Sequence, residues 1–185
     1  MNFPAASQRS THNEDGPRID DGGEDVTTIR LEAYNWLMAF TSIHKIRFDD
    51  VDGAGIVYYP QYFHLCHAAF EDFFDTAASI SYSELIRGRR LGFPTVAIES
   101  SFSAPLSYGD VAVVELSVET LGTTSATFTY RIRRRRDGIA CFAATVTTVL
   151  IDLDSQKPRD IPDDLRAILE TELGSSGCRT GKRNH

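Results

Sequence analysis

Cysteine is scarce in this chain, with only three among its 185 residues. Cys66, Cys141 and Cys178 show no paired spacing, so the sequence carries no disulfide framework. Cys66 and Cys141 lie inside apolar patterns that are typical of buried thiols. We therefore expect a protein of the reducing cytoplasm.

Long apolar runs are also missing, because no run reaches the roughly 18 to 20 residues of a membrane-spanning helix. The N-terminus lacks the basic-then-apolar order of an export signal. Basic residues are fewer than acidic ones, so the formal net charge is -7 and the pI is about 5.2. This balance argues against nucleic acid or an anionic membrane as a partner. The sequence has no G-x-S-x-G elbow, which argues against serine hydrolase chemistry.

The length and a hydrophobic share of 42% suit one domain with a core, which we place at residues 29–173. Residues 1–28 have few large apolar side chains, so they predict a disordered N-terminal tail. Residues 174–185 predict a flexible C-terminal tail. Residues 29–40 fit either a short amphipathic helix or an extension of the first strand.

The stretch at residues 48–74, FDDVDGAGIVYYPQYFHLCHAAFEDFF, organises the rest of the chain. It begins with Asp49, Asp50 and Asp52 in a glycine-containing turn. After Pro60, apolar residues recur at helical spacing and predict a long buried helix. The carboxylates therefore precede a helix N-terminus, whose unpaired N–H groups and macrodipole polarise a carbonyl or hold an anion.

Alternating patterns elsewhere predict strands, and Asp137-Gly138 predicts a hairpin between two of them. A helical region continues over residues 79–90, and a short helix follows Pro162. The order predicts an α+β fold in which a curved antiparallel five-stranded sheet wraps around one long central helix. The predicted strands are residues 41–48, 95–102, 111–121, 125–136 and 139–151.

The run DVDGAGIVYYPQYF, followed by an apolar helix and later by SFSAPLSYGD, resembles the hotdog-fold acyl-CoA thioesterases of the 4-hydroxybenzoyl-CoA thioesterase family. The resemblance covers residues 43–169. It implies the hotdog fold and hydrolysis of an aromatic (benzoyl-type) or short acyl-CoA to free acid and coenzyme A. It implies no metal, and no cofactor apart from the coenzyme A of the substrate. The most specific matching residues are Asp50, Asp52, Gly55, Ile56, Val57, Tyr58 and Tyr59.

The resemblance also implies roles for single residues. Asp52 corresponds to the catalytic carboxylate, acting as nucleophile or general base, and the Tyr59 backbone N–H polarises the thioester carbonyl. His67 and Phe93 depart from the polar pocket residues of the hydroxybenzoyl enzyme, so we hypothesise a less polar acyl group: benzoyl, another aryl group or a short acyl chain. The expected substrate-binding residues are Gly55, Ile56, Val57, Tyr58, His67, Phe93 and Pro94.

Arginines are the expected ligands of the coenzyme A phosphates, because guanidinium groups meet phosphate oxygens bidentately. The expected residues are Arg87, Arg89, Arg90 and Arg133. The arginine run at residues 131–136 offers a second phosphate site, although a solvated sheet end is the favoured interpretation of it. One helix covers only one sheet face, so we expect a homo-oligomer, which the resemblance implies is a dimer of dimers with sites at the interface.

Other interpretations of these residues carry less weight. A calcium loop fails because Ala54 and Gln61 occupy ligand positions. His64, Cys66 and His67 lack a distant ligand cluster, so a metal site is not expected. A non-catalytic acyl-CoA-binding hotdog protein and a hotdog dehydratase or hydratase remain as alternatives.

Overall fold

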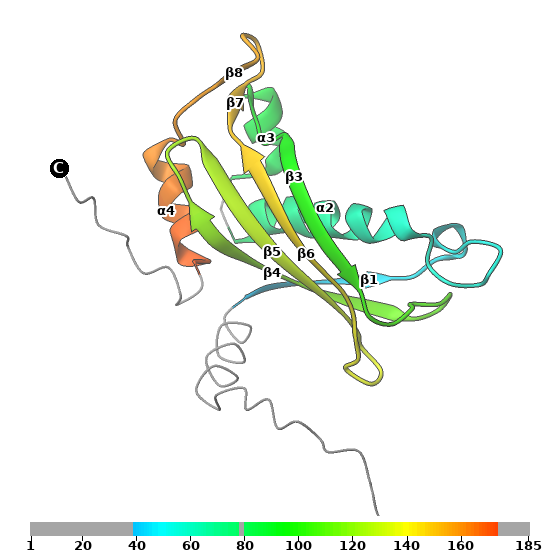
Figure 1. Ribbon diagram of the computed structural model, residues 1–185. Coiled ribbons are helices and arrows are strands. Elements are labelled where there is room, and N and C mark those ends of the chain that lie inside the picture. The colour runs from blue at the N-terminus through cyan, green and yellow to red at the C-terminus, as the bar shows by residue number, and fades with distance from the viewer. Residues whose placement is uncertain (1–38, 78–79, 174–185) are drawn as a thin grey trace, which may run out of the picture.

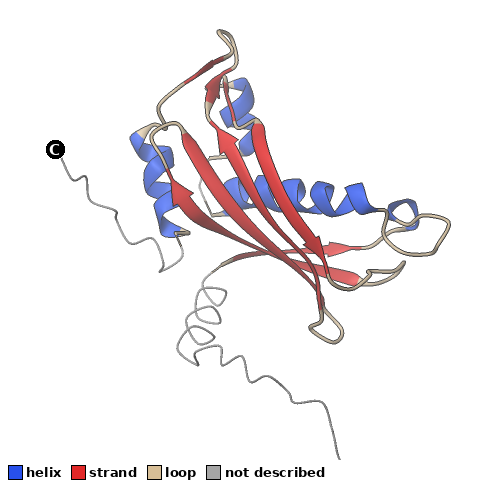
Figure 2. Cartoon of the chain, viewed as in Figure 1, coloured by secondary structure: helices blue, strands red, loops and turns tan. Residues whose placement is uncertain are grey.

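The computed structural model describes residues 39–77 and 80–173, so the predictions for residues 1–28, 29–38 and 174–185 lie outside the described residues. A curved antiparallel sheet wraps around one long helix, α2 (Tyr59–Thr76), which lies across one face of the sheet (Figures 1 and 2). The sheet has five strands in the order β1-β4-β5-β6-β3. The predicted α+β fold is confirmed. The strands are β1 (Phe40–Lys45), β3 (Thr95–Phe102), β4 (Val111–Leu121), β5 (Ser125–Arg134) and β6 (Ala140–Val149).

Buried and less buried side chains alternate along β4 and β5, as the apolar alternation in the sequence predicted. Val114, Leu116, Phe128 and Ile132 are fully buried, whereas the alternate residues Val113, Thr129 and Arg131 are only partly buried. Successive strand side chains point to opposite faces, so one face of the sheet packs on α2 and the other is partly polar. The ring of Phe128 meets Phe70 of α2 at a centroid distance of 5.1 Å.

Helix α2 begins where the sequence predicted it. Tyr58 caps it in extended backbone (φ -61°, ψ 130°), and Pro60 occupies the first turn. Proline suits that position because its φ is already helical and no hydrogen bond is lost there. Phe70, Phe73 and Phe74 are buried on the helix, and each such side chain contributes roughly 1.5–3 kcal/mol by leaving water. The helix therefore forms the centre of the core.

Several boundaries differ from the predictions: the strands expected at residues 125–136 and 139–151 are shorter, and two further differences have a local cause. The first strand ends at Lys45, and a 3₁₀ turn, η1 (Phe48–Asp50), replaces its expected last residues. The turn forms because the Asp50 carboxylate accepts the Arg47 N–H at 2.6 Å. The helical region expected at residues 79–90 is a separate short helix, α3 (Tyr82–Arg87), because Ser81 caps it by accepting the Glu84 N–H at 3.0 Å.

Smaller elements close the fold. A three-stranded sheet joins β2 (Leu91–Gly92), β7 (Ile151–Asp152) and β8 (Lys157–Pro158). The short helix expected after Pro162 is confirmed as α4 (Asp163–Thr171). No helix within the described residues is long and apolar enough to span a membrane.

Strand β3 is the exposed edge of the five-stranded sheet. It pairs on one side with β6, and all eight of its residues are exposed. Val96 is 60% exposed, Ile98 48% and Phe102 52%. An open strand edge that carries apolar side chains favours pairing with another strand.

Candidate active site

The turn that carries Asp52 is held by its own backbone. The Asp52 N–H donates to Ile56 O, and the Gly55 N–H donates to Asp52 O, both at 2.9 Å. The Asp52 carboxylate Oδ1 accepts the Ala54 N–H at 2.8 Å. Gly55 has a φ of +77°, a conformation that costs a side-chain-bearing residue about 1–2 kcal/mol. A glycine at this position therefore allows the turn to form without strain, and the turn holds Asp52 at a defined position.

The turn is tied to the start of α2 and to the β3–β4 connection. The Tyr58 N–H donates to Asp50 O at 2.9 Å, and the Val57 N–H donates to Leu106 O at 2.8 Å. The Leu106 N–H in turn donates to the Tyr62 hydroxyl at 3.0 Å. Burial raises the pKa of Tyr62, so its hydroxyl stays neutral. The chain of bonds fixes the turn relative to the first helical residues.

Asp52 and the start of α2 line one cavity of about 490 Å³, within the usual size range of small-molecule sites. Its wall is mostly aromatic and aliphatic, and Asp52 supplies its carboxylate. The Tyr59 N–H belongs to the first helical turn, whose N–H groups have no partner within the helix. The lining residues are Asp52, Ile56, Val57, Tyr58, Tyr59, Tyr62, Phe102, Ser103, Ala104 and Pro105.

Two other predicted substrate-binding residues, His67 and Phe93, line a separate cavity of about 140 Å³ between α2 and the sheet. His67 Nε2 lies 3.0 Å from Glu71 Oε1. Burial raises the pKa of the Cys66 thiol in this cavity to about 12, so it stays protonated and is a poor nucleophile. Pro94 contributes a carbonyl that accepts the Val149 N–H at 3.1 Å. A role for His67, Phe93 and Pro94 in substrate binding stays a prediction.

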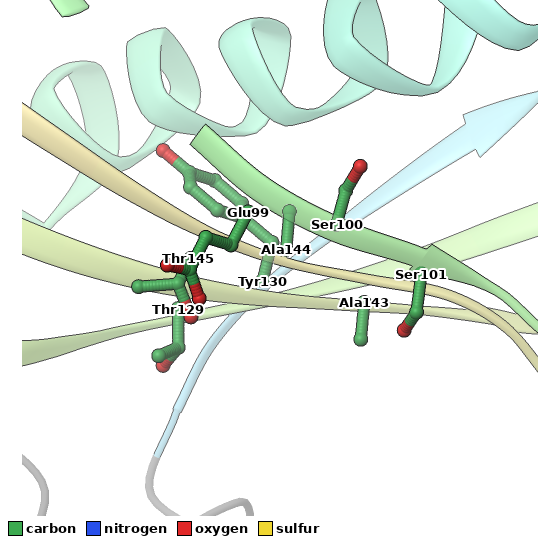
Figure 3. Close-up of a pocket in the computed structure, with 8 residues that line it drawn as sticks. All are labelled: Glu99, Ser100, Ser101, Thr129, Tyr130, Ala143, Ala144 and Thr145. Atoms are coloured by element: carbon green, nitrogen blue, oxygen red, sulfur yellow. The ribbon is translucent and has the colours of Figure 1, made fainter. Parts of the chain in front are cut away.

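A third hollow of about 400 Å³ lies on β3, β5 and β6 (Figure 3). Small and hydroxyl-bearing side chains dominate its lining, with Glu99 as the acid and Tyr130 as the aromatic ring. No helix N-terminus contributes to this lining, so a carbonyl bound there would lack the polarising N–H groups of the Asp52 cavity. Of these three cavities, only the Asp52 cavity has both a carboxylate and a helix N-terminus in its lining.

Three of the four arginines expected at the coenzyme A phosphates lie beyond the end of α2 that is opposite the Asp52 turn. Arg87, Arg89 and Arg90 follow the C-terminal end of α2, whose 18 residues span about 27 Å. Arg89 pairs with Asp164 at 2.6 Å, and Arg90 pairs with Asp154 at 2.8 Å. Arg133 pairs with the buried carboxylate of Glu115. Their binding to phosphate stays a prediction.

Several lining residues carried no predicted role in the sequence. Tyr62 stood out only as part of an apolar helical pattern, and the β3–β4 connection at residues 103–105 stood out only as part of SFSAPLSYGD. Their placement depends on tertiary contacts.

Within residues 39–77 and 80–173, no three His, Cys, Asp or Glu side chains are grouped to hold a metal ion.

A long helix wrapped by a curved antiparallel sheet is the hotdog arrangement, and in this chain a carboxylate-bearing turn precedes the helix N-terminus. Residues 46–169 match the family model of the thioesterase-like superfamily, and the chain belongs to that superfamily. The resemblance seen in the sequence is thus confirmed.

Relatives and solved structures agree with this class. A 1,4-dihydroxy-2-naphthoyl-CoA hydrolase of Nostoc punctiforme is 30% identical over 134 residues, covering 72% of this chain and 88% of the relative. A 1,4-dihydroxy-2-naphthoyl-CoA thioesterase structure from Synechocystis has a TM-score of 0.65 at 25% identity, covering 71% of this chain and 95% of that one. A gentisyl-coenzyme A thioesterase structure has a TM-score of 0.62 at 27% identity, covering 68% and 98%. The chain is a thioester hydrolase acting on acyl-CoA, as predicted.

Proposed function

We propose that the protein hydrolyses the thioester of an aromatic acyl-CoA, with Asp52 as the catalytic carboxylate. The observation that carries the proposal is that Asp52 and the N-terminus of α2 line the same cavity. Hydrolysis of a thioester needs a positioned carboxylate, a dipole that polarises the thioester carbonyl, and water. This cavity brings the first two together.

In the proposed reaction, the thioester carbonyl accepts a hydrogen bond from the Tyr59 N–H, and the positive end of the α2 macrodipole stabilises the developing oxyanion. Asp52 Oδ1 is held by Ala54, while Oδ2 accepts no hydrogen bond from the described residues. The Oδ2 atom acts either on the carbonyl carbon, giving a mixed anhydride that water then hydrolyses, or on a water that attacks the carbonyl. Both routes expel the coenzyme A thiolate.

Mass spectrometry of a rapidly quenched turnover separates the two routes. The nucleophilic route predicts the acyl mass on the peptide that contains Asp52, whereas the general-base route predicts no added mass.

The aromatic class of substrate rests on the lining of the cavity and on the relatives. Tyr58, Tyr59, Tyr62 and Phe102 surround the space next to Asp52. Tyr62 and Phe102 meet edge to face at 5.3 Å, and such rings favour a flat aromatic guest. The similar hydrolase and thioesterase named above are described for naphthoyl and gentisyl thioesters.

The experiment that tests the proposal measures coenzyme A release with a thiol reagent. The panel contains benzoyl-, 4-hydroxybenzoyl-, gentisyl- and 1,4-dihydroxy-2-naphthoyl-CoA, with acetyl- and hexanoyl-CoA as aliphatic comparisons. We expect kcat/KM for the best aryl substrate to exceed the aliphatic values by roughly 10-fold or more, the scale of one well-filled apolar contact. Equal or faster aliphatic hydrolysis, or no thiol release, would overturn it. A preference for 4-hydroxybenzoyl- over benzoyl-CoA would contradict the less polar acyl group hypothesised from His67 and Phe93.

We further propose that the active form is a homo-oligomer joined at β3, with a dimer of dimers as the larger assembly. Ile98 of this exposed edge lines the smaller cavity, and Phe102 lines the Asp52 cavity. A second copy paired along β3 would therefore cover apolar surface at both cavities.

Light scattering tests the assembly. We expect a multiple of the 20.6 kDa chain mass and a shift toward the monomer for Val96→Lys. Ile139→Lys, at an exposed position on the β5–β6 hairpin, is the control expected to keep the wild-type mass. A monomeric wild type would refute the assembly.

The cytoplasmic location stays a prediction that cell fractionation can test.

A further inference from the structure

Two aromatic rings lie unusually exposed beside the Asp52 cavity. Phe48 of η1 is 79% exposed and Tyr108 of the β3–β4 connection is 63% exposed. Their ring centroids are 6.0 Å apart and their planes are nearly perpendicular, at 89°. The two rings therefore form a right-angled corner, in which a flat group contacts the face of one ring and the edge of the other.

The backbone under this corner is held firmly. The Ile46 N–H donates to Asp110 O at 2.9 Å, and the Gly109 N–H donates to Ile46 O at 3.2 Å. The Asp110 carboxylate accepts the Ser107 N–H at 2.9 Å. Two hydrogen bonds at Ile46 thus join the chain segment that carries Phe48 to the segment that carries Tyr108, which keeps the two backbones side by side.

Arginines of the β5–β6 hairpin lie beside the corner. Arg136 Nη1 is 2.9 Å from the buried carboxylate of Asp110, two residues after Tyr108. The Arg135 N–H donates to Val111 O at 2.8 Å, and Arg135 pairs with no acid among the described residues. Guanidinium groups bind phosphate oxygens bidentately. The surface therefore offers aromatic rings and phosphate ligands together.

The corner is also linked to the Asp52 cavity through the backbone. Ile56, which lines the cavity, pairs through an isolated β-bridge with Ser107, the neighbour of Tyr108. A substrate whose thioester lies at Asp52 can therefore extend along this bridge to the corner.

We propose that the Phe48–Tyr108 corner binds the adenine base of coenzyme A, with Arg135 and Arg136 binding its phosphates. This inference rests on the proposed function, because it assigns the nucleotide end of the same substrate. An adenine ring supplies the flat aromatic group that the corner fits, and the attached phosphates supply the negative charge that the arginines fit. The corner contributes to substrate binding and takes no part in bond breaking.

The first test measures binding of adenosine 3′,5′-bisphosphate by calorimetry. Stacking of one base contributes roughly 1–3 kcal/mol, so Phe48→Ala with Tyr108→Ala is expected to weaken binding by roughly 5- to 150-fold. Tyr108→Phe keeps the ring and is expected to bind as the wild type does. Ile43→Ala, at an exposed apolar position on β1, is the control for loss of surface area. Equal binding by the wild type and the double variant, or no binding by the wild type, overturns the inference.

A second test separates this inference from the proposed function. The double variant is expected to lower kcat/KM for an aryl-CoA and to leave kcat/KM unchanged for the matching aryl-pantetheine, which lacks the nucleotide. Equal losses on both thioesters would overturn the inference, since the corner would then act on the reaction itself. If no thioester is hydrolysed, the proposed function fails, and the calorimetry still decides whether the corner binds a nucleotide.

A photoreactive 8-azidoadenosine 3′,5′-bisphosphate covers the case in which the double variant does not fold. Label on wild-type peptides that contain Phe48 or Tyr108, competed by coenzyme A, supports the site. Label confined to other peptides overturns it.

Discussion

Tyr62→Phe tests how the β3–β4 connection is held against α2. The Tyr62 side chain is 3% exposed, and its hydroxyl accepts the Leu106 N–H at 3.0 Å. Phenylalanine keeps the ring and its stacking on Phe142, at a centroid distance of 5.2 Å. The substitution therefore removes only the acceptor and leaves a buried N–H unpaired. An unpaired buried donor costs about 1–3 kcal/mol.

The assay is reversible unfolding in urea, checked by the thermal midpoint. A loss of 1–3 kcal/mol corresponds to a fall of roughly 3–15 °C in Tm for a domain of this size. Tyr58→Phe is the matched control: its side chain lines the same cavity but is 48% exposed, and we expect a change within about 0.5 kcal/mol. A loss below about 0.5 kcal/mol for Tyr62→Phe would refute the reasoning, since the Leu106 N–H would then have another partner.

Two further predictions concern the turn and the pH dependence of stability. Gly55→Ala should lower the free energy of unfolding in urea by about 1–2 kcal/mol, because Gly55 has a φ of +77°. Gly53→Ala is the control and should leave the free energy of unfolding unchanged, because Gly53 has no positive φ and open space where a Cβ would lie. Equal effects of the two substitutions would contradict this prediction. Burial lowers the pKa of His44 below 6.5, although Asp72 at 3.7 Å partly offsets the shift. The unfolded state therefore takes up the proton first as pH falls through 6.5, so stability should fall on acidification, and less so in His44→Gln. Parallel pH profiles of the wild type and His44→Gln would refute the assignment.

The sheet and the central helix were predictable because local patterns determine them. The alternation of Phe128, Tyr130 and Ile132 matches one buried face, and the Asp137-Gly138 hairpin is confirmed by Gly138 at a φ of +71°. In both cases the residue pattern and the tertiary environment favour the same structure.

The end of β1 was not predictable, because the alternation of Ile46 and Phe48 continues beyond the strand. Two hydrogen bonds turn the chain there and leave Phe48 exposed: the Asp50 carboxylate accepts the Arg47 N–H, and Arg47 O accepts the Asp50 N–H. Similarly, helical spacing could not show that Tyr62 and His67 line different cavities, because that depends on how the sheet covers successive turns of α2.

The most direct test of the central claim compares the wild type with Asp52→Asn in coenzyme A release from the best aryl-CoA. Asparagine keeps an Oδ1 acceptor for the Ala54 N–H, so the turn and the Tm should be preserved. Asp49→Asn removes the same charge at an exposed position three residues earlier and is the control expected to keep the wild-type rate. The account predicts a loss of about 10²-fold or more in kcat/KM for Asp52→Asn alone. An Asp52→Asn enzyme that hydrolyses the thioester at the wild-type rate would contradict it.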